Sequence, residues 1–232
     1  MILRDIERRV YSQNGEDGIT EYLLGVVDAS AKTLVEIGAG TGGKNNSRFL
    51  LERGWYGELF EREDSRWFAT LNERAKEWNC HISGAADEKT KPQLLAPVFF
   101  SLDIDSYDYW VASALLYRGF RPAIVIVEYN AAIDPDVATV PRGAVCEPNF
   151  LYFGCSLAAW KKLWVEFGYE FVTVCSAGIN AFFVESKSIV DRTRLDAIRW
   201  LGWMDCTIIA SYEGTYFERH ERLKLLYELI NV

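Results

Sequence analysis

A glycine-rich stretch in the first fifth of the chain reads Val35-Glu36-Ile37-Gly38-Ala39-Gly40-Thr41-Gly42-Gly43. Residues Thr33–Ile37 predict a buried strand, and a helix is expected at about 45–53, after the glycines. Glycines at such a junction let backbone amides approach a ligand closely. The stretch therefore predicts a turn that cradles a cofactor. The alternative is a tight turn that needs glycine only for steric reasons.

Strand-like and helix-like segments alternate up to about residue 185, with no linker or internal repeat between them. This alternation predicts an α/β fold with a largely parallel sheet. We expect one domain over residues 1–187 and a helical tail over 188–232 that packs on it. The expected strands are Thr33–Ile37, Tyr56–Glu61, His81–Ala85, Val98–Ile104, Ile124–Tyr129, and the antiparallel hairpin Tyr169–Cys175 and Asn180–Glu185. The expected helices cover about 3–10, 16–27, 45–53, 65–78, 107–118, 156–167, 189–201 and 216–230.

The composition excludes several classes of protein. The 232 residues are 50% hydrophobic and include 33 Asp and Glu against 25 Lys and Arg, so the formal net charge is -8. This balance fits a globular domain and excludes a disordered or collagen-like chain. The absence of a Lys/Arg block argues against a partner made of duplex nucleic acid.

Nothing in the sequence resembles a membrane span or a secretory signal. No apolar run approaches the roughly 20 residues that cross a bilayer, and acidic residues interrupt the N-terminal apolar residues. The five cysteines are irregularly spaced and form no Cys-x-x-Cys pair. We therefore expect a cytosolic protein with reduced thiols.

An acidic residue about 20 positions after the glycines would bind ribose hydroxyls, and Glu61 at the end of the second expected strand has that spacing. The glycines also spell Gly38-x-Gly40-x-x-Gly43, the dinucleotide fingerprint, which requires the same acidic residue. Glu36, just before the glycines, is not part of the dinucleotide pattern. Glu36-x-Gly38-x-Gly40-x-Gly42 resembles motif I of class I S-adenosylmethionine-dependent methyltransferases.

Five further segments make the chain resemble an FkbM/TylF-like group of O-methyltransferases from polysaccharide and natural-product pathways. The resemblance implies a Rossmann-like fold with seven strands and a C-terminal antiparallel hairpin, S-adenosylmethionine as cofactor, and a hydroxyl of a sugar, glycan or natural product as acceptor. The segments are Ser12–Gly18, Lys44–Leu51, Ser101–Asp105, Val127–Asn130 and Gly178–Val184, which together cover residues 12 to 185.

The resemblance also implies roles for residues at the cofactor. Glu36 would face the methionine part, Glu61 would hold the ribose, and Gly38 and Gly40 would let the backbone approach the cofactor. On the resemblance alone, Gln13, Asn14 and Asn45 lie near the same pocket. Helix capping and turn formation are the alternative role for these three residues.

Acidic residues follow two expected strands that are neighbours in this fold. Asp103 and Asp105 end one strand, and Glu128 and Asn130 end the next. Because the carboxyl ends of parallel strands line the ligand crevice, Asp105, Glu128 and Asn130 are the expected Mg²⁺ ligands. The resemblance to metal-dependent O-methyltransferases indicates the same, although Tyr129 separates residues that those families place side by side.

A base is needed to remove the proton of an acceptor hydroxyl, and Asp103 or Asp108 is the candidate. Two alternatives stay open. The acids act without a metal, or some of them only cap the helix that begins near Tyr107.

Residues 131–150 hold three of the six prolines and predict a lid, with Tyr152 and Phe153 at its far hinge. Trp110 and Tyr129 are candidates for stacking on an acceptor ring, with core packing as the alternative for Trp110. The apolar tail segment around Trp200, Trp203 and Met204 is expected to dock on the domain or to form a dimer contact.

The sequence as a whole favours an S-adenosylmethionine-dependent O-methyltransferase with a sugar or glycan-like acceptor. The alternatives are a catalytically silent binding subunit of this fold and a nicotinamide-dependent oxidoreductase. A homo-oligomer or a pathway partner protein remains open.

Overall fold

The computed structural model describes most of the chain. The described residues are 2–86, 90–105, 107–131, 133–141, 154–198 and 200–202, together with the backbone of a short strand at 227–229. Half of the expected lid, residue 132 and residues 142–150, lies outside the described residues, and so do Tyr152, Phe153, Trp203 and Met204.

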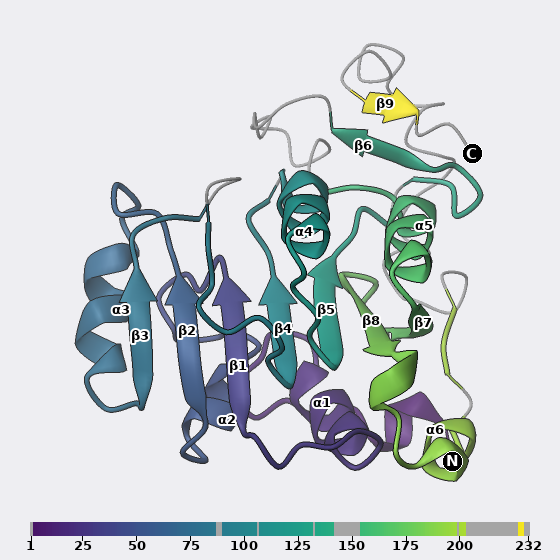
Figure 1. Ribbon diagram of the computed structural model, residues 1–232, viewed down its shortest axis with the longest axis horizontal. Coiled ribbons are helices and arrows are strands. Elements are labelled where there is room, and N and C mark those ends of the chain that lie inside the picture. Colours follow the sequence, from purple (N-terminus) through teal and green to yellow (C-terminus); the bar gives the residue numbers. More distant parts are fainter. Residues whose placement is uncertain are drawn as a thin grey trace.

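A seven-stranded mixed sheet with the order β3-β2-β1-β4-β5-β8-β7 forms the centre of the molecule. Strands β1 to β5 run parallel to one another, whereas β8 is antiparallel to both β5 and β7 (Figure 1). The sheet confirms the predicted parallel core and terminal hairpin. The strands are β1 Thr33–Ile37, β2 Tyr56–Phe60, β3 Cys80–Ser83, β4 Phe99–Leu102, β5 Ile124–Glu128, β7 Tyr169–Val174 and β8 Asn180–Glu185.

Helices cover both faces of this sheet. On β4, Phe100 and Leu102 pack with helices α4 and α5, whereas Phe99 packs with α1, α2 and α6. Because successive side chains of a strand point to opposite faces, a strand covered on both faces reads as a continuous apolar run. The helices are α1 Glu16–Leu24, α2 Arg48–Leu51, α3 Phe68–Ala75, α4 Asp108–Tyr117, α5 Leu157–Glu166 and α6 Arg192–Asp196, with 3-10 turns at Leu3–Asp5 and Ser186–Ser188.

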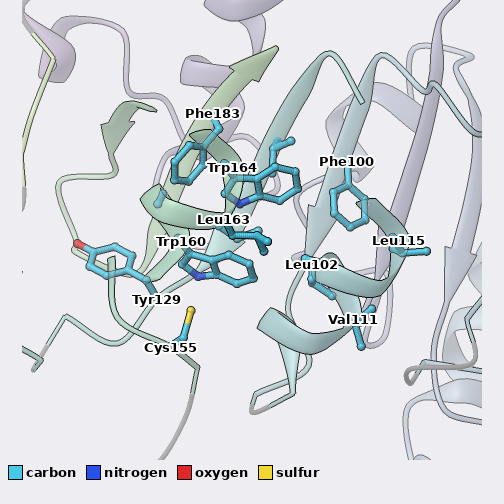
Figure 2. Close-up of a cluster of buried hydrophobic side chains, with 14 of the residues drawn as sticks. Phe100, Leu102, Val111, Leu115, Tyr129, Cys155, Trp160, Leu163, Trp164 and Phe183 are labelled. Atoms are coloured by element: carbon cyan, nitrogen blue, oxygen red, sulfur yellow. The ribbon is translucent and has the colours of Figure 1, made fainter. Parts of the chain in front are cut away.

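Two tryptophans of α5 fix this helix against the sheet (Figure 2). Trp160 and Trp164 are fully buried, and their rings stack with centroids 6.2 Å apart. Burial of a side chain of this kind stabilises the fold by about 1.5–3 kcal/mol. The Trp160 Nε1 also donates a hydrogen bond of 2.7 Å to the carbonyl oxygen of Glu128. The same packing that stabilises the core therefore holds the carboxyl end of β5 in place.

Gly38 permits the closest approach between two strand ends. It has a φ of +86°, and a Cβ at this position would lie 1.6 Å from the carbonyl oxygen of Asp103. Any side chain here would force the end of β1 away from the end of β4. The first glycine of the motif thus has a demonstrable steric role.

Several expected helices are shorter in the structure or are replaced by other elements. The helix expected at 45–53 forms only over Arg48–Leu51, because Asn45 and Asn46 bind the carboxylate of Glu36 instead. Within the segment expected to be the lid, Thr139–Pro141 forms strand β6, and this strand pairs with β9, Tyr227–Leu229. The expectation of helix at 227–229 was therefore wrong, and the rest of the helix expected at 216–230 lies outside the described residues.

The beginning of the tail packs on the domain. Ile198 is buried, and the ring of Trp200 meets that of Tyr22 from α1 edge-on, with centroids 5.9 Å apart. Of the described residues within the helix expected at 189–201, those from Arg192 to Asp196 form helix α6. Among the described residues, no helix combines the length and the apolar character that a membrane span requires.

Candidate functional site

A cavity of about 1460 Å³ opens at the carboxyl edge of the parallel strands. It extends from the loop after β3, across the ends of β2, β1, β4 and β5, to the first residue of β8. The N-terminal loop before α1 supplies part of its wall. Ligands of open α/β folds bind at this edge of the sheet, so the cavity is the candidate site.

One half of the cavity, the glycine-loop half, is lined by Glu36, Gly38–Thr41, Gly43–Asn46 and Glu61. Glu61 is buried, with 6% of its surface exposed. Its Oε2 accepts a hydrogen bond of 2.8 Å from the Gly40 N–H, and its Oε1 accepts one of 3.1 Å from the Arg62 N–H. These contacts place a carboxylate beside the glycine turn, as the spacing of the motif predicts.

Glu36 organises the loop that follows the glycines. Its carboxylate accepts hydrogen bonds from Asn45 Nδ2, from the Asn46 N–H at 3.0 Å and from the Ser47 hydroxyl. Burial raises the pKa of Glu36 above its usual value, while these donors act in the opposite direction. Glu36 and Asn45 both line the cavity.

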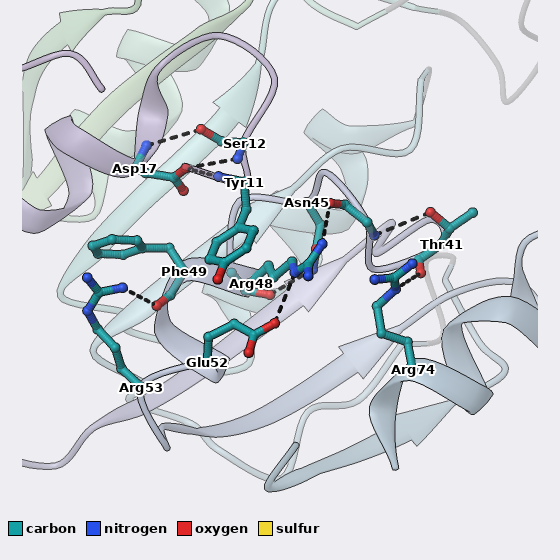
Figure 3. Close-up of polar contacts among 12 residues, drawn as sticks. Tyr11, Ser12, Asp17, Thr41, Asn45, Arg48, Phe49, Glu52, Arg53 and Arg74 are labelled. Carbon is teal, nitrogen blue, oxygen red and sulfur yellow. Dashed lines mark hydrogen bonds and ion pairs between the residues drawn. The ribbon is translucent and has the colours of Figure 1, made fainter. Parts of the chain in front are cut away.

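A buried carboxylate shapes the N-terminal loop (Figure 3). Asp17 Oδ2 accepts hydrogen bonds from three consecutive N–H groups, those of Val10, Tyr11 and Ser12, at 2.6 to 2.9 Å. Charge-assisted hydrogen bonds of this kind are among the stronger ones in proteins. They fold the loop back so that Gln13 and Asn14, both predicted cofactor residues, lie in the cavity wall.

The other half of the cavity, the acidic half, consists of Glu16, Asp103, Asp105, Glu128 and Asn180, which all line the cavity. Carboxylate oxygens of the two aspartates and Glu128 lie within 4.8 Å of one another. The backbone of Asp105 has a φ of 65°, a left-handed conformation that turns the chain sharply after β4.

The electrostatic environment of Asp103 differs from that of an exposed aspartate. Burial, followed by the negative charges of Asp108, Asp105 and Glu36, raises the pKa of Asp103 well above its usual value. Partial desolvation also raises the pKa of Asp105, although its side chain is exposed at the cavity. A carboxylate with a raised pKa is the better proton acceptor, as a general base requires.

Asp108 and Asn130 lie away from the cavity lining. Asp108 is fully buried at the start of α4, where its Oδ1 accepts a hydrogen bond of 2.8 Å from the Ile104 N–H. Asn130 is also fully buried, because β5 ends at Glu128 and Tyr129 then bridges to Cys155. The prediction for Asn130 assumed that the alternation of side chains continues beyond Glu128, but the strand ends at that residue. Asp103 lies with Asp105 and Glu128 instead.

The structure adds Glu16, Asn180 and four cationic side chains to the predicted site. The cations Lys44, Arg48, Arg62 and Arg74 all line the cavity. Arg48 and Arg74 donate hydrogen bonds of 2.9 and 3.1 Å to the carbonyl oxygens of Gly43 and Thr41 in the glycine loop. The polar run before α1 was a signal for Glu16, and a polar residue opening a strand was a signal for Asn180. Neither signal indicates which distant segment the residue meets.

The comparisons with known proteins concern the fold. No protein-family model matches the chain, and no curated protein matches it in sequence. Among solved structures, a candidate S-adenosylmethionine-dependent methyltransferase from Listeria monocytogenes is similar, with a TM-score of 0.51, 10% identity, and coverage of 72% of this chain and 96% of the other. This chain has the methyltransferase Rossmann-like fold.

Two further solved structures are similar at lower scores. The amino pentose methyltransferase CalS10 from Micromonospora echinaspora has a TM-score of 0.48 and 10% identity, covering 74% of this chain and 90% of its own. The mitomycin 7-O-methyltransferase MmcR has a TM-score of 0.46 and 18% identity over 74% of this chain. This chain spans 55% of the length of the mitomycin enzyme.

Proposed function

We propose that this protein is an S-adenosylmethionine-dependent methyltransferase. The observation that carries the proposal is the pairing of the Glu61 carboxylate with the Gly40 N–H at the end of β2, in a cavity that continues to the carboxylates of the acidic half. A carboxylate at this strand end can accept hydrogen bonds from the two ribose hydroxyls of an adenosine. Open α/β folds bind their ligands at this edge of the sheet, which supports a cofactor there.

The cavity fits this cofactor. Gly40 has a φ of +55°, and no heavy atom lies within 4 Å of the position that a Cβ would take there. A side chain at Gly40 would therefore project into open space beside Glu61, where the adenosine part is expected. Glu36, Asn45, Gln13 and Asn14 line the continuation of the cavity and are the candidates for contacts with the methionine part.

The acidic half supplies the acceptor chemistry in this proposal. Bound S-adenosylmethionine presents a methyl group on a sulfonium ion to an acceptor atom. We propose that the acceptor is a hydroxyl of a sugar, a glycan or a natural product, and that Asp103 removes its proton. The raised pKa of Asp103 and its place in the cavity support this role, whereas Asp108 lies away from the lining.

A magnesium ion is part of the proposal. Asp105 and Glu128 offer carboxylate oxygens close together, which is the ligand type that Mg²⁺ prefers, whereas Asn130 lies outside the cavity lining. When bound there, the ion would lower the pKa of an acceptor hydroxyl. Asp105 and Glu128 would hold it, and Asp103 would receive the proton.

Calorimetry with S-adenosylmethionine, S-adenosylhomocysteine and NAD tests the proposed function. We expect both adenosyl ligands to bind and NAD to give no signal. Binding of NAD without any response to the adenosyl ligands would overturn the proposal and favour an oxidoreductase. Binding of neither class would also contradict it.

A further inference from the structure

A second pair of glutamate and asparagine, distinct from Glu36 and Asn45, lies in the acidic half. Glu16 begins α1 and is 1% exposed, and Asn180 begins β8 and is 4% exposed. Asn180 Nδ2 donates a hydrogen bond of 2.8 Å to Glu16 Oε1, which joins residues 164 positions apart. Both side chains line the cavity.

The hydrogen bonds of Glu16 come only from neutral groups. Its carboxylate also accepts from the Asn14 N–H at 2.7 Å and from Asn14 Nδ2 at 3.1 Å. Within the described part of the chain, none of the ion pairs includes Glu16. Buried charges in proteins are normally paired. A carboxylate that is buried at a cavity without a cationic partner is therefore suited to a cation brought by a ligand.

Asn180 retains an acceptor that no described residue uses. A carboxylate can only accept hydrogen bonds, so the Nδ2 of Asn180 must face Glu16 and its Oδ1 must point elsewhere. This Oδ1 is shielded from solvent and accepts no hydrogen bond from the described residues. Leaving such an oxygen unsatisfied is costly, typically about 1–3 kcal/mol. A ligand that donates N–H groups would remove this cost.

The charges of the surroundings favour the same kind of ligand. In the acidic half, Asp103, Asp105 and Glu128 add negative charge, and every charged side chain of this half is a carboxylate. The cavity-lining cations Lys44, Arg48 and Arg74 lie at the glycine loop, and Arg62, which follows Glu61, pairs with Asp64. The pair of Glu16 and Asn180 therefore offers a charged acceptor and a neutral acceptor in a negative field. An ammonium group, with one positive charge and three N–H donors, matches this arrangement.

We propose that Glu16 and Asn180 bind the α-ammonium group of the methionine part of S-adenosylmethionine. This inference rests on the proposed function, because it assumes that this cofactor occupies the cavity. The Glu16 carboxylate binds the positive charge of the ammonium group, and Asn180 Oδ1 accepts one of its N–H groups. Asn14 holds the Glu16 carboxylate in position. The pair thereby makes the N-terminal loop and the β7–β8 hairpin jointly responsible for recognising the amino-acid end of the cofactor.

Calorimetry on the full chain with two ligands tests the inference. S-adenosylhomocysteine carries the ammonium group, whereas 5′-methylthioadenosine lacks the amino-acid part. In Glu16→Gln we expect the affinity for S-adenosylhomocysteine to fall about tenfold or more, because a charge-assisted contact is lost. The affinity for 5′-methylthioadenosine should change by less than about twofold. This ligand lacks the group that Glu16 would bind, and changes at well-separated sites act nearly independently.

A matched control is the substitution Glu58→Gln. Glu58 is 2% exposed and accepts hydrogen bonds from the Gln93 and Leu94 N–H groups, but it does not line the cavity. This variant should leave both affinities unchanged. If Glu16→Gln fails to fold, Asn180→Ala is expected to give the same selective loss for S-adenosylhomocysteine, because it removes the free Oδ1.

The possible outcomes separate the inference from the proposed function. If Glu16→Gln weakens both ligands equally, or neither, then Glu16 only holds the loop and the inference is overturned. If the wild-type protein binds neither ligand, the proposed function fails first. A desamino analogue of S-adenosylhomocysteine should bind the wild type and Glu16→Gln equally well. A large difference for this analogue would contradict recognition of the ammonium group.

Discussion

The two halves of the cavity are assembled in different ways. In the glycine-loop half, Glu61 reaches the Gly40 N–H across 21 positions, and Glu36 binds Asn45–Ser47 within 11 positions. In the acidic half, Glu16 meets Asn180 across 164 positions, and the carboxylates come from the ends of two strands. One half is a local motif, whereas the other exists only once α1, β4, β5 and β8 have packed.

The difference also appears in the chemistry of the two halves. The glycine-loop half presents backbone N–H groups, the carboxylates of Glu36 and Glu61, and the nearby cations Lys44 and Arg74. The charged side chains of the acidic half are all carboxylates, and burial together with mutual repulsion raises the pKa of Asp103. The comparison indicates that one half recognises a cofactor by shape and hydrogen bonds, and that the other concentrates negative charge for a cationic group, a metal or a proton.

The largest expected effect comes from a substitution at Gly38, where the two halves of the cavity meet. Gly38→Ala places a Cβ against the carbonyl oxygen of Asp103, 1.6 Å away, in a backbone with positive φ. We expect a loss of roughly 3 kcal/mol or more in the free energy of unfolding, measured by chemical denaturation. The control is Gly54→Ala, which has a similar φ of +77° but no atom within 4 Å, so it should cost only about 1–2 kcal/mol. Equal losses in the two variants would contradict the steric role of Gly38.

Metal chelation should affect only the acidic half. With excess EDTA we expect methyl transfer to stop, while the affinity for S-adenosylmethionine measured by calorimetry stays nearly unchanged. The reason is that Asp105 and Glu128 would hold the ion, whereas the glycine-loop half holds the adenosine part. Added Mg²⁺ should restore turnover. Full activity in EDTA would remove the metal from the mechanism and leave the carboxylates alone to catalyse the reaction.

Removal of the proposed base should separate turnover from binding. Asp103→Asn keeps the size of the side chain but cannot accept the proton, so we expect turnover to fall about a hundredfold or more while cofactor affinity is retained. In the wild type, Asp103 must be deprotonated to act. Because the neighbouring carboxylates raise the pKa of Asp103 when no cation is bound, turnover without a metal should fall at acid pH already above the usual aspartate range, and bound Mg²⁺ should move this fall to lower pH. A variant with the wild-type pH profile and rate would refute the role.

The smallest expected effect tests whether Glu61 of the glycine-loop half binds the ribose. Glu61→Ala removes a charged acceptor from the ribose hydroxyls, which costs about 1.5–3 kcal/mol, or roughly tenfold or more in the dissociation constant of S-adenosylmethionine. Glu63→Ala is the control, because Glu63 lines the same cavity with an exposed side chain. If the two variants bind the cofactor equally well, Glu61 is not the ribose ligand.

The strands of the sheet and the position of Glu61 beside the glycine turn could be predicted from local sequence patterns. The bounds of β1 and β8 agree with the predicted strands residue for residue, and Glu61 lies beside the glycine turn. Strands buried on both faces leave unbroken apolar runs, and a turn that needs positive φ leaves glycines, so both can be recognised within a few residues. The acidic strand ends Asp103, Asp105 and Glu128 were predictable for the same reason.

Which polar residues share the cavity depends on contacts between distant segments of the chain. Asp108 accepts a hydrogen bond from the Ile104 N–H in the loop before α4. Asn130 lies outside the cavity lining because the preceding residue, Tyr129, forms a β-bridge with Cys155. The meeting of Glu16 with Asn180 depends on how α1 packs against the sheet, and the pairing of β6 with β9 depends on a segment far along the chain. Local sequence patterns indicate which residues are buried and where the chain turns. Contacts between distant segments depend on the packing of the whole core, so neither segment carries a pattern that predicts them.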